Sequence, residues 1–164
     1  MKIKTFNDLF IDQIKDLYNA ESQLLKALPR MAKNASDPKL KEGIEKHFEQ
    51  TKIQRDRLEK VCKILDIKPT GKKCVAMEGL LEEAKEIIDN VKDPKVLDAG
   101  LIAASQKVEH YEIASYGTVA TFAKELGNEE VLDILIENLD EEKETDEKLT
   151  DIAQNSVNEK AAHD

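Results

Sequence analysis

The chain has 164 residues, a formal net charge of −9, and a composition that is 36% charged and only 4% aromatic. Glycine and proline are scarce, with six and four residues, while the helix formers Lys, Glu, Leu and Ala are abundant, so the composition predicts an all-α protein. The negative charge excludes a non-specific nucleic-acid surface, which requires clustered Lys and Arg. No window approaches the roughly 18 apolar residues of a membrane span.

The N-terminus and the two cysteines favour a cytoplasmic protein. Lys2 and Lys4 are followed by no apolar run, so we expect no signal peptide. Cys62 and Cys74 are too few for a disulfide framework and lack the C-x-x-C spacing of a zinc site. We expect reduced thiols, with Cys74 exposed, although the sequence leaves a single bridge open.

Two long helices are predicted in the first half of the chain. Thr5 is suited to cap the first, whose apolar positions recur at helical spacing as far as Met31. Pro29 lies inside this run and should bend the helix rather than end it. Ser36-Asp37-Pro38 predicts a new start, because aspartate caps helices and proline is favoured at the first helical position. The second helix should reach about Leu65.

A loop, a short helix and two further long helices are predicted in the second half. The periodicity fails from Asp66 to Met77, and an amphipathic segment follows from Glu78 to Val91. Asp93-Pro94 repeats the cap-and-proline signal and opens the third long helix. That helix should end at Gly127, with Asn128 capping the fourth.

These elements predict two antiparallel helix pairs. A tight turn joins the members of each pair, whereas the long connector with its short helix can cross the whole bundle. The sequence therefore predicts a single domain of residues 1–155, folded as a four-helix bundle with one long crossover. Residues 156–164 lose the apolar pattern and are expected to fray.

Polar residues interrupt the inner apolar stripe of each long helix near its midpoint. In the third helix, Glu112 shares a face with Val108 and Val119, and Glu109 lies one turn earlier. The other core-facing polar residues are Glu21 in the first helix, His47 and Thr51 in the second, and Glu142 and Asp146 in the fourth. Because the midpoints of antiparallel helices lie at similar heights, these side chains should form one transverse layer.

A buried layer of carboxylates requires compensation, because each unpaired buried ion costs several kcal/mol. We therefore predict a dinuclear metal site at mid-bundle. Oxygen and imidazole ligands suit iron or manganese, and iron is the preferred assignment. The predicted ligands are Glu21, His47, Glu109, Glu112, Glu142 and Asp146.

A metal-free interpretation stays open at this point. In it, the carboxylates belong to a buried hydrogen-bond network with tyrosines and other polar core residues, which fixes the register of the helices. Arg55 or Arg57 then neutralises Glu109, and Asp146 pairs with a lysine of its own helix. The two interpretations differ in what lies beside the acids.

Four strings of residues carry a family resemblance. They are Asp16-Leu17-Tyr18-x-Ala20-Glu21, Leu25-x-Ala27-Leu28-Pro29-x-Met31-Ala32, Gly71-Lys72-Lys73-Cys74-x-Ala76-Met77-x-Gly79-Leu80 and Lys107-Val108-Glu109-His110-Tyr111-Glu112. These strings resemble the YciE/YciF stress-protein family of ferritin-like domains, and the resemblance covers nearly the whole chain. It implies a ferritin-like, rubrerythrin-related bundle, stress-related expression in bacteria and a metal site.

The chain departs from the di-iron pattern in one respect. Di-iron bundles carry Glu-x-x-His on two helices. Here Ile44, Lys107 and Lys160 stand three residues before the histidines at 47, 110 and 163, so the motif is absent. The ligand number, and with it an oxidase or peroxidase activity, is left open.

Two functions are compatible with the sequence. The first is Fe(II) oxidation or peroxide reduction at a carboxylate-bridged metal pair in a stress-response protein. The second is a non-enzymatic bundle that acts as a homodimer in the stress response. The short helix carries an apolar stripe that a partner could cover, although we favour its packing on the parent bundle; the stripe consists of Leu80, Leu81, Ala84, Ile87 and Ile88.

Overall fold

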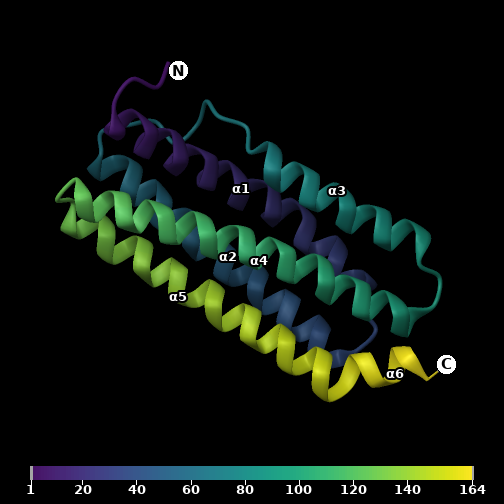
Figure 1. Ribbon diagram of the computed structural model, residues 1–164. Coiled ribbons are helices and arrows are strands. Elements are labelled where there is room, and N and C mark those ends of the chain that lie inside the picture. The colour runs from purple at the N-terminus through teal and green to yellow at the C-terminus, as the bar shows by residue number, and fades with distance from the viewer. Residues whose placement is uncertain (1, 164) are drawn as a thin grey trace.

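A computed structural model describes residues 2–163, so the end residues 1 and 164 of the predicted domain and tail lie outside it. Four long helices run along the molecule (Figure 1): α1 (Phe6–Asn34), α2 (Pro38–Ile64), α4 (Pro94–Glu125) and α5 (Glu129–Ile152). Three shorter elements complete it: α3 (Val75–Asn90), the π-helical turn η1 (Ala153–Val157) and α6 (Asn158–Ala162). The predicted all-α, ferritin-like four-helix bundle is confirmed.

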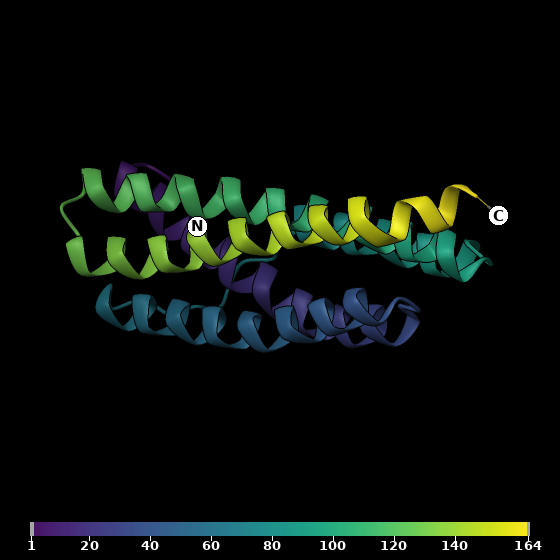
Figure 2. The same ribbon diagram turned by 90° about the horizontal axis from the view of Figure 1, so that it is seen from below.

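Tight turns join α1 to α2 and α4 to α5, and a long crossover links the two hairpins. Figure 2 shows the α4–α5 turn at one end of the bundle. The crossover carries α3, which lies along α1 and α4 (Figure 1). No helix among the described residues is both long and apolar enough to cross a bilayer.

The predicted caps start three of the long helices. The Thr5 side chain begins α1 with a reciprocal capping box, and the carboxylates of Asp37 and Asp93 each accept two backbone N–H groups ahead of a first-turn proline. Gly127 follows α4 with φ +71°, a conformation that favours glycine. Asn128 precedes α5 as predicted, but its side chain makes no capping hydrogen bond.

The apolar stripe of α3 faces the bundle. Ala84 is buried, and the other four stripe residues pack against the core: Leu80, Leu81, Ile87 and Ile88. The two helices approach closely because Gly100 of α4 has no side chain; a Cβ there would lie 2.7 Å from Cγ2 of Ile87. The favoured expectation of packing on the parent bundle is confirmed, and four of the five stripe residues stay partly exposed.

The C-terminal tail remains helical, in contrast to the predicted fraying. Val157 is 1% exposed, while the Ser156 hydroxyl and the Lys160 ammonium donate to Oδ2 of Asp37 at 2.9 and 2.8 Å. The neighbouring Lys160 lowers the pKa of the Asp37 carboxyl to about 2. The cap of α2 therefore also anchors the tail. Ala153 and Val157 continue the four-residue spacing from Leu149 and are buried, although the backbone of this turn is π-helical.

The apolar core is divided into two clusters, one toward each end of the bundle. In α1, Ile14 and Leu17 belong to one cluster, and Leu24 and Leu28 belong to the other. The same division occurs in α2, α4 and α5. Between the clusters every long helix turns a polar side chain inward, and Glu21 does so in α1. The predicted transverse polar layer is present at this height.

We expect Gly100→Ala to destabilise the protein by about 1–3 kcal/mol, because the new methyl group overlaps a methyl close to the backbone of Ile87. Urea denaturation followed by circular dichroism measures the change. Gly79→Ala is the matched control: Gly79 is helical and exposed, a Cβ added there would have no neighbour within 4 Å, and the variant should gain stability. Equal stability of the two variants would contradict the close contact.

Candidate metal centre

Five predicted ligands converge in the layer between the apolar clusters. Each lies on the buried face of its helix. They are Glu21 from α1, His47 from α2, Glu109 and Glu112 from α4, and Glu142 from α5. His47 is 4% exposed and the four carboxylates are 0% exposed.

His47 and three carboxylates form the centre of the group. One ligand atom from each of His47, Glu109, Glu112 and Glu142 lies within 4.8 Å of the others. His47 Nδ1 is 3.2 Å from Oε1 of Glu109, and its Nε2 is 3.9 Å from Oε2 of Glu142. Nevertheless, as ionised groups the three glutamates have no hydrogen-bond partner at either carboxylate oxygen, and His47 Nε2 has none. The Glu109 and Glu142 carboxyls lie close enough to hydrogen-bond to each other when one of them is protonated. Buried oxygen and nitrogen atoms without a hydrogen-bond partner are suited to bind a metal cation.

Glu21 completes the layer and is oriented from one side. The Tyr116 hydroxyl donates a hydrogen bond to its Oε1, while its Oε2 has no partner. Asn138 donates to the Tyr116 hydroxyl at 3.2 Å, and Arg57 donates to Oδ1 of Asn138 at 3.0 Å. This chain of hydrogen bonds fixes the Tyr116 hydroxyl, which in turn holds Oε1 of Glu21. The other oxygen of Glu21, Oε2, is left available to the layer.

Sequence analysis missed Asn138, a buried residue that positions the site. It lies seven residues after Val131, on the inward face of α5, whereas the adjacent and more apolar Leu139 is only partly buried. The i+7 spacing from Val131 and the i−4 spacing from Glu142 were the available signal.

Burial disfavours the charged form of every ionisable group in the layer. It raises the pKa of Glu21 to about 8 and that of Glu142 to about 7. It raises the pKa values of Glu109 and Glu112 well above their usual range, and neighbouring carboxylates add to the effect. Burial also lowers the pKa of His47 to about 4. Without a cation, the layer is protonated acid beside neutral imidazole.

Asp146, the sixth predicted ligand, lies outside this group. Its Oδ2 is 3.2 Å from Nε2 of His110, and its Oδ1 accepts from Gln106 at 3.2 Å, both on α4. Thr145, where a Glu-x-x-His motif would place histidine, donates to the backbone oxygen of Glu141 at 3.0 Å. Helix α5 therefore brings a single carboxylate into the layer.

The arginines of α2 do not neutralise the layer. Arg57 pairs with Glu137 and Glu141 at the surface, and Arg55 pairs with Asp56. Within residues 2–163, no lysine or arginine forms an ion pair with the buried carboxylates. An arginine beside Glu109, the strongest support for the metal-free interpretation, is therefore not found, whereas the hydrogen bond from Tyr116 to Glu21 belongs to the network that this interpretation expects.

Cys74 is buried rather than exposed, which corrects the sequence-based expectation. Its Sγ lies 3.0 Å from the hydroxyl of Tyr111, which donates to Oδ2 of Asp16 at 2.5 Å. Its Sγ also accepts the backbone N–H of Met77 and so caps α3. Cys62 is buried as well, and both thiols are free as predicted.

The fold and the layer define a class: a ferritin-like four-helix bundle with a carboxylate–histidine cluster at its centre. More specifically, the chain belongs to the family described as Domain of unknown function (DUF892), whose profile matches residues 5–162.

Relatives of known sequence and structure confirm the predicted YciE/YciF resemblance. Protein YciF of Escherichia coli (strain K12) is 50% identical over 162 residues, which is 98% of each chain. The crystal structure of that E. coli stress protein aligns with a TM-score of 0.91 over 95% of this chain and 99% of YciF. YcfI of Rhodopseudomonas palustris, provisionally described as a structural protein, is 44% identical, with a TM-score of 0.89 over 91% of this chain and 95% of its own.

We expect the metal-free protein to lose stability as the pH rises from 6.5 to 8. In this range unfolded glutamates are ionised. In the folded protein the pKa values of Glu109 and Glu112 are raised well above the usual range, so these two carboxyls stay protonated. Glu21 and Glu142, with pKa values of about 8 and about 7, add to the difference only up to those pH values. The folded state then binds more protons, so its free energy of unfolding falls by up to about 1.4 kcal/mol per pH unit for each protonated carboxyl. His47 opposes the trend near pH 6.5, where part of the unfolded imidazole is protonated, and this opposition disappears by pH 8.

Urea denaturation of chelator-treated protein at several pH values measures this dependence. Metal-loaded protein is the control, because cations replace the protons and should remove the fall. A free energy of unfolding that is flat or rises over this range in the metal-free protein would contradict the buried acid layer.

Proposed function

We propose that the protein is a stress-response protein of the ferritin-like class that binds a dinuclear metal centre. The ligands are Glu21, His47, Glu109, Glu112 and Glu142. The observation that carries the proposal is the set of buried carboxylate oxygens from three helices with no hydrogen-bond partner. The description of E. coli YciF as a stress protein supports the physiological context.

Charge balance supports two metal ions rather than one. Four buried carboxylates bring four negative charges when ionised, and His47 is neutral. Two divalent cations neutralise that charge, whereas one leaves two uncompensated charges in an apolar interior. Oxygen ligands with one imidazole suit iron or manganese, and we assign iron.

The residues divide naturally into roles. Glu112 would be the ligand shared between the two cations, because burial and the neighbouring carboxylates of Glu21, Glu142 and Glu109 all oppose the ionisation of its carboxyl. His47 would bind one cation through its imidazole. Tyr116 holds Glu21 in place, and the two apolar clusters exclude water from both ends.

Bound iron would supply Fe(II) oxidation, with a peroxide as the oxidant that is reduced. The protein contributes proton control: the carboxyls release protons when cations bind, since their pKa values are raised without metal. Tyr111 lies one residue before Glu112 and donates to Asp16, an arrangement that suits a phenol giving up an electron and its proton.

A structural role is the second candidate, and the provisional description of YcfI favours it. In this alternative the protein acts as a homodimer without chemistry. The α3 stripe is partly covered by the parent bundle, and the exposed Ile53 of α2 and Ile136 of α5 offer further apolar surface to a dimer. Light scattering at micromolar concentration separates a dimer from a monomer.

We expect purified wild-type protein to hold about two metal ions per chain and Glu112→Gln to lose at least one. The amide cannot bridge two cations as a carboxylate does, whereas its similar shape preserves packing. Elemental analysis with an Fe(II)-oxidation assay measures both consequences. At pH 8 the metal-free Glu112→Gln variant should also have a higher free energy of unfolding than the metal-free wild type. The neutral amide removes a carboxyl whose ionisation is opposed by burial and by the neighbouring carboxylates.

Asp146→Asn is the matched control on the neighbouring helix. Asp146 contacts His110 and Gln106 outside the layer, so this variant should keep its metal and its oxidation rate. Full metal content in Glu112→Gln, or a metal-free wild type after growth with iron, would contradict the proposal.

A further inference from the structure

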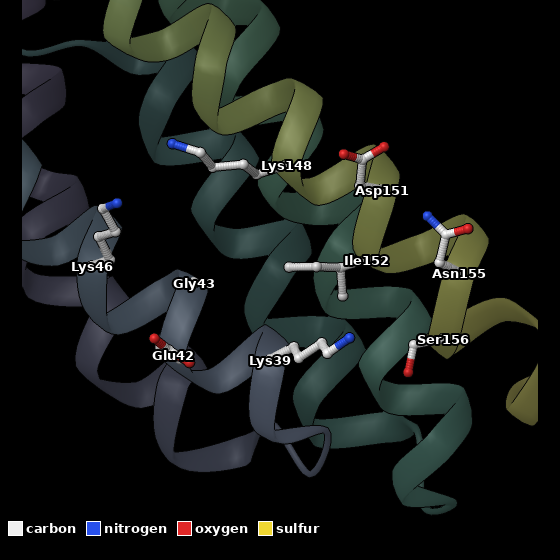
Figure 3. A pocket seen from close by; sticks show the side chains of 9 residues that line it. All are labelled: Lys39, Glu42, Gly43, Lys46, Lys148, Asp151, Ile152, Asn155 and Ser156. Atoms are coloured by element: carbon white, nitrogen blue, oxygen red, sulfur yellow. The ribbon is translucent and has the colours of Figure 1, made fainter.

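A groove runs along the surface between α2 and α5. Its volume is about 360 Å³, and α2 forms one wall while the end of α5 and the η1 turn form the other (Figure 3). The side chain of Ile152 projects across it toward the α2 backbone at Gly43 (Figure 3). The residues that line it are Lys39, Glu42, Gly43, Lys46, Lys148, Asp151, Ile152, Asn155 and Ser156.

A smaller cavity beside the groove reaches a ligand of the proposed metal centre. This cavity, of about 40 Å³, shares Gly43, Lys46, Lys148 and Ile152 with the groove, and His47 forms part of its wall. This volume has room for about two water molecules. His47 is 4% exposed, and its Nε2 is buried without a hydrogen-bond partner. The surface is therefore linked to the one imidazole of the layer.

Glycine keeps the passage open where the two walls approach. A Cβ at Gly43 would lie 3.6 Å from Cδ1 of Ile152, an ordinary contact distance. An alanine would therefore just touch the opposite wall, and a longer side chain would occupy the space between the helices. Gly43 lines both the groove and the inner cavity, so a side chain at this position acts on both.

The mouth of the groove carries ammonium groups as well as carboxylates. Three lysines line the outer groove, against Glu42 and Asp151. Within residues 2–163, Lys46 makes no ion pair, and the Lys148 ammonium pairs only with Glu144, at 3.0 Å. Ammonium groups at the mouth raise the energy of an approaching divalent cation, whereas they do not repel a neutral molecule and they attract an anion.

From these observations we infer that the α2–α5 groove is the entrance through which a small neutral or singly anionic molecule, of two or three heavy atoms, reaches the His47 side of the metal centre. The inference rests on the proposed function, since it assigns the access route of that site. Peroxide has the required size and charge, and azide is a suitable probe of the same passage.

Azide association with iron-loaded protein tests the route without turnover. Stopped-flow absorbance follows the azide–iron charge-transfer band in the wild type, Gly43→Met and Gly79→Met. We expect Gly43→Met to slow association at least tenfold at unchanged iron content, because its side chain fills the passage. Gly79 is exposed on α3, away from the groove, so Gly79→Met should match the wild type.

Two further variants test the route if Gly43→Met does not fold. Ile152→Ala removes the side chain that projects across the groove and should speed azide association several-fold. Lys46→Gln should slow azide association several-fold at low salt and less at high salt, because it removes attraction at the mouth.

The outcomes separate the access route from the metal centre itself. Iron-loaded Gly43→Met or Ile152→Ala that binds azide at the wild-type rate would overturn the entrance and leave the metal centre standing. Wild-type protein that binds no iron would overturn the proposed function and the entrance together.

Discussion

The cost of burying four carboxylates at one height is the constraint on which this structure depends. Glu21, Glu109, Glu112 and Glu142 are fully buried, and no lysine or arginine among the described residues pairs with them. Isolated charges in such an interior cost several kcal/mol each, so the acids must be protonated or must share cations. The raised pKa values describe the first state, and the partnerless oxygens are suited to the second.

The remainder of the bundle stabilises this unfavourable layer. Apolar clusters lie on both sides of it, and their burial offsets its cost. The hydrogen-bonded series Arg57, Asn138 and Tyr116 fixes Glu21 from the surface inward. Asp37, which caps the start of α2, also accepts hydrogen bonds from Ser156 and Lys160. The segment after α5 is therefore held at the end of the bundle where α2 begins.

Helical periodicity was sufficient to predict the bundle and most of the layer. Glu112 could be placed inside because Val108 and Val119 share its face, and all three are buried. Asp146 follows Glu142 by four residues, a rotation of about 40°, which is enough to turn it toward His110 on α4. The tail was missed although Ala153 and Val157 continue the spacing from Leu149, because the residues between them are polar and the anchor at Asp37 is a long-range contact. Whether cations occupy the layer depends on the free energy of metal binding relative to that of protonating the carboxylates. The spacing of residues in the sequence does not determine this difference.

Anomalous X-ray diffraction at the iron edge, from crystals of protein purified from iron-supplemented cells, tests the central claim most directly. The account predicts two anomalous peaks enclosed by Glu21, His47, Glu109, Glu112 and Glu142. A well-ordered layer with no anomalous peak, and with the carboxyl groups hydrogen-bonded to one another as acids, would contradict it.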